Sequence, residues 1–204
     1  MTIAGNKRKH ESKNPIQVAL IDRFKRHAAA LTRRAAPKTV LDLGCGEGFM
    51  LDALVRAGID ATFTGIDLSE TALAEARERL GARATLEHAD ARQLVSDGRS
   101  FDLVMMLEVL EHIPDPAQML PILKQLTRGH VLLSVPREPF FCALNFMRGK
   151  NLRRLGNDPE HVNHWGRRSF FRFLEPHFEI LAAPAVFPWT MVLARPARPA
   201  SRWS

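Results

Sequence analysis

Apolar residues along the chain form two kinds of pattern, short continuous runs and segments in which they recur every three or four positions. The continuous runs are rich in β-branched residues and predict strands at 39–43, 62–67, 84–88, 101–106 and 130–135. The periodic segments between them predict helices at 49–57, 70–80 and 116–126. Strands and helices that alternate in this way are typical of a doubly wound α/β fold with a mostly parallel sheet.

The N-terminal part of the chain follows a different pattern. Residues 1–14 are polar and mixed in charge, so we expect a disordered tail. In the segment 15–38, apolar positions recur at helical spacing over 15–34, opposite three basic side chains, Arg23, Lys25 and Arg26. This pattern predicts a basic N-terminal helix. Two roles are open to it, packing on the sheet or holding a polyanionic substrate.

The regular alternation stops after the fifth predicted strand. Residues 136–164 are interpreted as an insertion rather than a linker because further elements follow, a helix at 167–174 and strands at 178–183 and 190–194. The predicted domain therefore covers 39–195, and residues 196–204 are expected to form a tail. Because ligands of a doubly wound sheet bind over the carboxyl ends of its strands, the insertion is predicted to cover the site and recognise the substrate.

Length and composition are those of one soluble globular domain. The chain has 204 residues, 46% of them hydrophobic and 25% charged, which is enough for a sizeable core. The N-terminus lacks the apolar segment of a secretory signal. The most apolar region, 131–147, is interrupted by prolines and charges and is too short to span a bilayer. Only two cysteines, Cys45 and Cys142, are present, which favours a reducing compartment, so we predict a cytoplasmic protein.

The net charge of +7 is unevenly distributed. Residues 1–38 hold ten Lys or Arg and two acids, residues 39–135 hold eight and fifteen, and residues 136–204 hold eleven and five. The basic ends indicate a partner that carries phosphates or carboxylates, such as a phosphorylated small molecule, RNA or the surface of a membrane. A solvated basic surface that only keeps the protein soluble explains them equally well.

Three glycines and one acid predict a nucleoside site. Gly44, Gly46 and Gly48 follow the first predicted strand, and Asp67 ends the second. Glycines in such a turn let the backbone approach a ligand closely, and a carboxylate about twenty residues on accepts hydrogen bonds from a ribose diol. The G-x-G-x-G spacing lacks the third glycine of a dinucleotide site, whose place Phe49 takes, so a pyrophosphate would fit poorly.

Four motifs carry a family resemblance. In chain order they are LDLGCGEG, GIDLS, HADA and FDLVMMLEVLEH, all between residues 40 and 135. Together they resemble the class I methyltransferases that depend on S-adenosylmethionine. The resemblance implies a Rossmann-like α/β fold with a seven-stranded, mostly parallel sheet and helices on both faces. It also implies S-adenosylmethionine as the cofactor and methyl transfer as the reaction.

The same resemblance assigns the cofactor contacts. Asp42 is expected near the methionine moiety, where a carboxylate complements the ammonium group. Asp67 is expected on the ribose hydroxyls and Asp90 on the adenine amino group, with apolar contacts from Phe49 and Leu68. The full set of expected cofactor residues is Asp42, Gly44, Cys45, Gly46, Gly48, Phe49, Asp67, Leu68, Asp90, Ala91 and Leu107.

The catalytic groups should follow the fourth strand, where the sequence places Glu108, Glu111 and His112. If a helix begins near Glu108, the spacing i, i+3 and i+4 puts all three on one face. Two carboxylates and an imidazole on one face suit a divalent metal. Without a metal, His112 would act as a general base or be a buried, hydrogen-bonded residue. His164 is the second choice as general base or metal ligand.

These residues also resemble two metal-using branches of the family. One is the ubiquinone-pathway catechol O-methyltransferases, and the other is the methyltransferases that act on the 3′-terminal ribose of small RNAs. The resemblance implies that Mg or Mn is held by Glu108, Glu111, His112 and a fourth ligand, His161, and that it chelates a vicinal diol of the substrate.

We therefore predict an S-adenosylmethionine-dependent O-methyltransferase of a small hydroxylated substrate, with diol-bearing, anionic or lipid-linked acceptors as variants. The second hypothesis is a 2′-O-methyltransferase of RNA 3′ ends, although that branch carries additional RNA-binding segments. A third hypothesis, from another class, is a non-catalytic module that binds S-adenosylmethionine without turnover. The spacing that places Phe49 after the last glycine disfavours a nicotinamide dehydrogenase. The sequence leaves the oligomeric state open.

Overall fold

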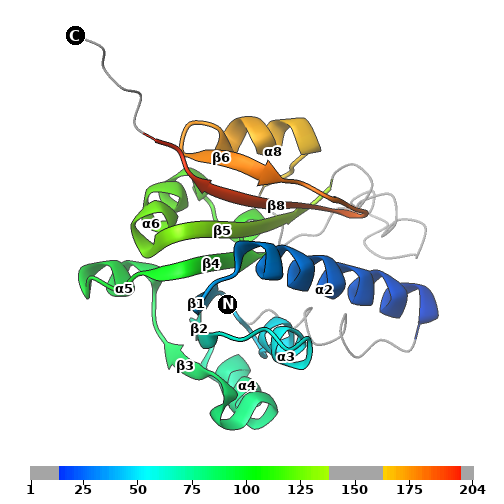
Figure 1. Cartoon of the computed structure of the whole chain (residues 1–204), viewed down its shortest axis with the longest axis vertical. Helices are drawn as coiled ribbons and strands as arrows, with labels where there is room; N and C mark the ends of the chain where they lie inside the picture. The colour runs from blue at the N-terminus through cyan, green and yellow to red at the C-terminus, as the bar shows by residue number, and fades with distance from the viewer. Residues whose placement is uncertain (1–13, 138–162, 199–204) are drawn as a thin grey trace.

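The structure is a computed structural model of the chain, and residues 14–137 and 163–198 are described. Their strands form one mixed sheet in the order β3-β2-β1-β4-β5-β8-β6, with a short β7 paired to β8 (Figure 1). The bounds are β1 Thr39–Leu43, β2 Thr62–Asp67, β3 Thr85–His88, β4 Phe101–Leu107, β5 Thr127–Pro136, β6 Phe178–Ala182, β7 Ala185–Val186 and β8 Trp189–Pro196.

Strands β1 to β5 pair in parallel, whereas β8 runs antiparallel to both β5 and β6. The predicted seven-stranded, mostly parallel sheet is therefore confirmed, and β7 adds a two-residue strand at one edge. The predicted tails and most of the predicted insertion lie outside the described residues.

Helices cover both faces of the sheet, as predicted. Their bounds are α2 Pro15–Ala35, α3 Phe49–Arg56, α4 Glu70–Leu80, α5 Ala91–Ser96, α6 Met119–Leu126 and α8 Arg167–Leu174. One cluster of buried side chains joins α2, α3 and α4 to one face, and a second cluster joins α5, α6 and α8 to the other. None of the helices within the described ranges is long and apolar enough to cross a membrane.

The predicted N-terminal helix is present as α2. It begins after Asn14, whose side-chain oxygen accepts hydrogen bonds from the N–H groups of Ile16 and Gln17 at 3.0 and 3.4 Å. This side chain thus caps the first turn. The apolar face of α2 buries Ile21 and Phe24 against the sheet.

Two of the basic side chains of α2 hold it on the edge of the sheet. The guanidinium group of Arg23 donates to the carbonyl oxygen of Ala185 in β7 at 2.8 Å. That of Arg34 donates to the carbonyl oxygen of Leu181 in β6 at 3.2 Å. These bonds favour packing on the sheet, rather than binding of a polyanion, as the role of both arginines.

Helix α5 lies outside the predicted elements because it has only six residues, too few for an apolar period to show. A capping box defines it instead. The Asp90 carboxylate accepts the N–H of Arg92 at 2.7 Å. In return, the side-chain oxygen of Gln93 accepts the N–H of Asp90 at 2.8 Å.

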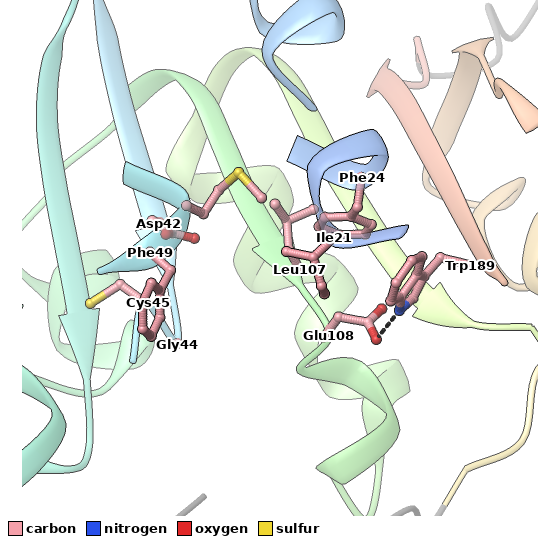
Figure 2. A pocket seen from close by; sticks show the side chains of 10 residues that line it. Ile21, Phe24, Asp42, Gly44, Cys45, Phe49, Leu107, Glu108 and Trp189 are labelled. Atoms are coloured by element: carbon pink, nitrogen blue, oxygen red, sulfur yellow. Dashed lines mark hydrogen bonds between the residues drawn. The ribbon is translucent and has the colours of Figure 1, made fainter. Parts of the chain in front are cut away.

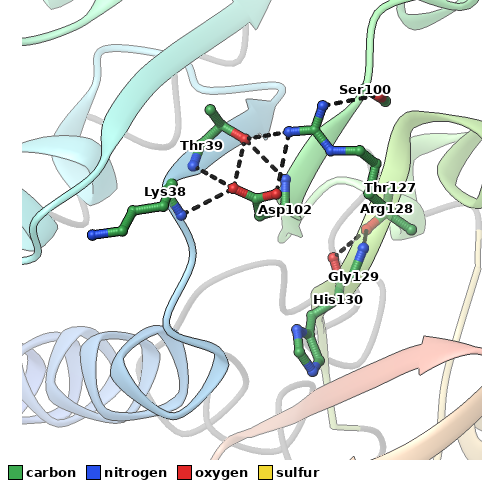
Figure 3. A network of polar contacts seen from close by, with 8 residues as sticks. All are labelled: Lys38, Thr39, Ser100, Asp102, Thr127, Arg128, Gly129 and His130. Atoms are coloured by element: carbon green, nitrogen blue, oxygen red, sulfur yellow. Dashed lines mark hydrogen bonds and ion pairs between the residues drawn. The ribbon is translucent and has the colours of Figure 1, made fainter.

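A polar network stabilises the end of the sheet opposite to the turn that contains Gly44, Gly46 and Gly48 (Figure 3). One Asp102 carboxylate oxygen accepts the N–H of Lys38 at 3.0 Å, and the N–H and hydroxyl of Thr39 at 2.9 and 3.0 Å. The other oxygen accepts from the Arg128 guanidinium at 3.2 Å. Partial burial raises the pKa of Asp102, but the hydrogen bonds from Thr39, Arg128 and Lys38 outweigh it and hold this pKa below its usual value.

We expect Asp102→Ala to lower the free energy of unfolding by about 1–2 kcal/mol at pH 7, because the backbone N–H groups of Lys38 and Thr39 and the Thr39 hydroxyl lose their acceptor. Since the folded pKa of Asp102 is depressed, its contribution is present above the unfolded value of about 4 and is lost as the pH falls below it. Urea unfolding at pH 7 and pH 3 measures both effects. Asp60→Ala is the control, because that side chain is 98% exposed and has one long ion pair at 3.5 Å. Equal stability of the two variants at pH 7 would contradict this prediction.

Candidate active site

The loop that follows β1 lies against the end of β2. The N–H groups of Gly44 and Cys45 both donate to the carbonyl oxygen of Ile66, at 2.9 and 3.0 Å. Gly44 has φ +73°, and a Cβ built there would lie 2.8 Å from Cγ2 of Val109. The backbone conformation and this close approach both require glycine. The predicted glycine turn is therefore present at the carboxyl end of the sheet.

Asp67, at the end of β2, joins this turn to the next loop. One oxygen of its carboxylate accepts the N–H of Gly46 at 2.8 Å. The other accepts the N–H of Ser69 at 2.8 Å. A carboxylate oxygen has lone pairs for more than one donor, so Asp67 can also accept from a ribose diol. Leu68 beside it is 69% exposed, which suits a predicted contact with a nucleoside.

A pocket opens between the glycine turn and the end of β4. It is lined by Ile21, Phe24, Asp42, Gly44, Cys45, Phe49, Met50, Leu107, Glu108 and Trp189. Six of the residues predicted to bind the cofactor or act in catalysis are among them, namely Asp42, Gly44, Cys45, Phe49, Leu107 and Glu108. Figure 2 shows Asp42, Cys45 and Phe49 at one end and Glu108 with Trp189 at the other. We call these the glycine-loop side and the Glu108 side.

Asp42 is the buried acid of the glycine-loop side. Its side chain belongs to β1 and is only 3% exposed. Burial, and then the nearby charge of Asp67, raise the pKa of Asp42 to about 7. A positively charged group bound in the pocket would favour the ionised form and lower that pKa again. Burial likewise raises the pKa of the Cys45 thiol, in keeping with its interpretation as a small residue of the turn rather than a reactive thiol.

Phe49 begins α3 and lies between two basic side chains. The Arg79 guanidinium carbon is 3.7 Å from the centre of the ring, and the Lys25 ammonium nitrogen is 5.7 Å from it. Cations at these distances are attracted to the face of an aromatic ring. Lys25 comes from α2 and Arg79 from α4, so the Phe49 ring contacts side chains of both helices. Partial burial lowers the pKa of Lys25.

The end of β4 differs from the predicted helix start. Glu108 has φ +59° and is not helical. A single 3-10 turn, Leu110–His112, follows it, with Glu111 1% exposed and His112 half-buried. The i, i+3, i+4 spacing of a helix therefore does not apply here. A left-handed residue after a strand turns the chain sharply. The prediction that Glu108, Glu111 and His112 share one helical face assumed a regular helix start instead.

The described residues do not assemble a metal site. Within 14–137 and 163–198, no three His, Cys, Asp or Glu side chains are arranged to hold a metal ion. The fourth predicted ligand, His161, lies outside these ranges, and His164 is described as exposed. The metal centre at Glu108, Glu111, His112 and His161 therefore stays a prediction.

Within the described ranges, Ser134 and Trp189 both donate to the carboxylate of Glu108. The hydroxyl of Ser134 in β5 donates to Oε1 at 3.0 Å. The indole N–H of Trp189 in β8 donates to Oε2 at 2.6 Å (Figure 2). Sequence reasoning missed both partners because no motif contains them. They approach Glu108 only through the order β4-β5-β8 in the sheet.

The chain returns from the undescribed segment 138–162 directly to the turn after Glu108. The side-chain amide of Asn163 donates to the carbonyl oxygen of Ile113 at 2.6 Å. Its backbone N–H donates to the carbonyl oxygen of Glu111 at 3.1 Å. The sequence did not indicate a role for Asn163, although it lies between His161 and His164 in the predicted insertion. The end of the insertion thus packs beside the predicted catalytic turn.

Asp90 and Ala91 lie farther along the same edge, after β3. Asp90 caps α5, and its carboxylate also lies 3.5 Å from the Arg92 guanidinium with 40% of its side chain exposed. An exposed capping carboxylate can accept a further hydrogen bond, so its predicted contact with adenine stays a prediction.

A family model described as a methyltransferase domain matches residues 40–129. Among curated proteins, the chain is similar to the ubiquinone biosynthesis O-methyltransferases of Aromatoleum aromaticum and Pseudomonas paraeruginosa. Each is 38% identical over 133 residues, which is 62% of this chain and 53% of the relative. The chain thus spans about half the length of the curated relatives that it matches.

Two solved structures support the same fold. Magnesium protoporphyrin IX methyltransferase from Synechocystis PCC 6803, with bound SAH, has a TM-score of 0.69 at 21% identity, over 94% of this chain and 92% of that one. The methyltransferase domain of bacterial CtHen1 has a TM-score of 0.64 at 23% identity, over 86% of this chain and 99% of that one.

Proposed function

We propose that the chain is a class I S-adenosylmethionine-dependent methyltransferase and that it methylates a hydroxyl oxygen of a small substrate. The observation that carries the proposal is the pocket, which joins the buried carboxylate of Asp42 to the held carboxylate of Glu108. We assign the glycine-loop side to the cofactor and the Glu108 side to the methyl acceptor. The O-methyltransferase relatives favour oxygen as the methylated atom.

The residues of the cofactor side fit a sulfonium amino acid with a nucleoside. Asp42 is buried and lies next to the glycine turn, where it would accept from the ammonium group. Asp67 would accept from the ribose hydroxyls, and Phe49 and Leu68 would contact the base. When bound, S-adenosylmethionine supplies an electrophilic methyl group.

The acceptor side must orient a hydroxyl and remove its proton. Glu108 would accept a hydrogen bond from that hydroxyl at the end of the pocket. His112, in the turn after Glu108, would take the proton as general base. The apolar walls formed by Ile21, Phe24 and Leu107 would exclude water from the methyl acceptor.

Calorimetric titration of S-adenosylhomocysteine, with EDTA and then with Mg²⁺ or Mn²⁺ plus catechol, tests the proposal. Binding in EDTA is expected with a Kd in the micromolar range or below, and methyl transfer to catechol should follow with S-adenosylmethionine. Binding strengthened by metal and diol together would favour the metal-assisted variant. Binding without transfer to any hydroxylated acceptor would favour the non-catalytic module, and no binding would refute the proposal.

Methylation of RNA 3′ ends is the second candidate, favoured by the structural likeness to the CtHen1 domain. A labelled RNA with a free 2′-hydroxyl at its 3′ end and one with a 2′-O-methyl group distinguish it from small-molecule methylation. Transfer to the first RNA and not to catechol would favour RNA.

Asp42→Asn should change stability and cofactor affinity in opposite directions. Since burial raises the pKa of Asp42 in the folded protein from its usual 3.8 to about 7, its contribution to stability is present below about pH 4 and lost as the pH rises through 7. We expect the variant to be more stable than wild type at pH 8 by about 2 kcal/mol, and not at pH 4. Its affinity for S-adenosylhomocysteine, which keeps the ammonium group, should fall about tenfold or more at pH 8.

Urea unfolding at both pH values and calorimetry measure these two effects. The matched control is Asp60→Asn, which changes an exposed acid before β2 and should alter neither quantity. Lower stability of the Asp42 variant at pH 8 would contradict the prediction.

A further inference from the structure

Glu108 is held in a backbone conformation that its residue type disfavours. Within the described ranges, Ala36 and Glu108 are the non-glycine residues with positive φ. Ala36 ends a helix, where this conformation is common. Glu108 follows a strand and lines the pocket. Strain of this kind persists where the surrounding structure imposes it, and it gathers at functional positions.

The surrounding contacts fix the direction of the Glu108 carboxylate. The hydroxyl of Ser134 donates to Oε1, and the same hydroxyl oxygen accepts the N–H of Glu108 at 3.1 Å. The indole N–H of Trp189 donates to Oε2 at 2.6 Å, and a hydrogen bond to a carboxylate is charge-assisted. Ser134 is fully buried and Trp189 is 8% exposed, so water competes little for either bond.

Helix α2 in turn fixes the indole. The rings of Phe24 and Trp189 meet edge to face, with their centres 4.9 Å apart and their planes at 60°. Both side chains are buried and both line the pocket. An edge-to-face pair holds the orientation of the ring, and therefore that of its N–H.

We propose that Trp189 is a positioning residue, which fixes the Glu108 carboxylate so that it accepts a hydrogen bond from the hydroxyl group of the methyl acceptor. This inference rests on the proposed function. A carboxylate oxygen carries two lone pairs, so one that accepts a hydrogen bond from the protein can also accept one from a ligand. The walls around it are apolar or aromatic, namely Ile21, Phe24, Leu107 and the indole itself. A flat hydroxylated ring is therefore the acceptor that this end of the pocket fits.

Trp189→Phe tests the positioning role, because it keeps an aromatic ring beside Phe24 and removes the N–H donor with part of the indole. We expect the affinity for S-adenosylhomocysteine to stay within about threefold of wild type. The kcat for methylation of catechol should fall at least about tenfold, with a smaller change in KM, because a misdirected carboxylate costs more in the transition state than in binding.

Trp165→Phe is the matched control. Trp165 packs against Phe170 and Phe173, and its buried indole N–H has no hydrogen-bond partner among the described residues. The same chemical change should therefore leave kcat at the wild-type value. A kcat of Trp189→Phe equal to that of this control would overturn the positioning role.

A ¹H–¹⁵N spectrum reports directly on the indole N–H groups. If Trp189 had only a structural role, its resonance would not respond to the methyl acceptor. The Trp189 resonance, assigned by its loss in Trp189→Phe, should shift when catechol is added to the complex with S-adenosylhomocysteine. It should not shift on the same addition to Glu108→Gln. A wild-type resonance that ignores catechol would overturn the acceptor contact, whereas a wild type that does not bind S-adenosylhomocysteine would contradict the proposed function itself.

If Trp189→Phe does not fold, Glu108→Ala and Glu108→Gly provide a second test. Both lack the carboxylate, so both should lose at least about tenfold in kcat. Glycine accepts positive φ without strain, so its variant should melt about 2–4 °C above the alanine variant. Wild-type turnover in either variant would overturn the role of Glu108.

Discussion

Replacing His112 by alanine should lower methyl transfer by at least about 100-fold while leaving the affinity for S-adenosylhomocysteine within about twofold of wild type. The imidazole belongs to the 3-10 turn that follows Glu108, on the acceptor side, and is not among the residues that line the pocket beside the glycine turn. A general base there acts on the acceptor proton and not on the cofactor. Loss of the base should therefore appear in kcat and not in cofactor binding.

Single-turnover transfer to catechol and calorimetry measure the two quantities for His112→Ala. The matched control is His130→Ala, since His130 is a half-buried histidine at the opposite end of the sheet, beside the Asp102 network. It should transfer methyl groups at the wild-type rate. Full turnover by the His112 variant would return this residue to a structural role and remove our catalytic assignment.

Replacing Asp67 by alanine should weaken S-adenosylhomocysteine binding by about 100-fold or more. The variant loses the proposed acceptor of the ribose hydroxyls, and a hydrogen bond to a charged group contributes about 1.5–3 kcal/mol. It also loses the two bonds of 2.8 Å that hold the N–H groups of Gly46 and Ser69. Because those bonds join two loops of the site, their loss should loosen the glycine turn as well.

Calorimetry with Asp67→Ala and Asp60→Ala compares two acids near the opposite ends of β2. The Asp60 variant should bind with wild-type affinity. Thermal midpoints of both variants, measured without cofactor, show whether the Asp67 variant is folded at the temperature of the titration. A folded Asp67 variant that binds within threefold of wild type would contradict the assignment of this carboxylate to the ribose.

Several elements could be predicted because local signals agree with one another. The strands predicted at 39–43 and 62–67 and the helix at 70–80 match β1, β2 and α4 residue for residue. In α4, the side chain of Ser69 accepts the N–H of Ala72 and so marks the first turn, while the apolar spacing marks the buried face. The glycine turn was equally readable, since three glycines within five residues have few other uses.

The acceptor side could not be predicted in the same way. Positive φ at Glu108 has no sequence signal, because glutamate rarely adopts it. The contact between Trp189 and Glu108 joins residues 81 positions apart and depends on the antiparallel entry of β8 beside β5. Asn163 donates to a turn about fifty positions earlier in the chain. Such contacts follow from tertiary structure, and periodicity does not contain them.

Some residues that line the pocket lie inside the segment that the family model matches, and others lie outside it. The glycine-loop side of the pocket, and Glu108 itself, lie within the matched residues 40–129. Ile21, Phe24 and Trp189 come from α2 and β8, outside that match. We therefore expect substitutions at Ile21 in α2 to change the preference for the methyl acceptor, as long as Trp189 is kept. For protein engineering, α2 is thus the element to vary, whereas the sheet, with Trp189 in β8, is the part to keep unchanged.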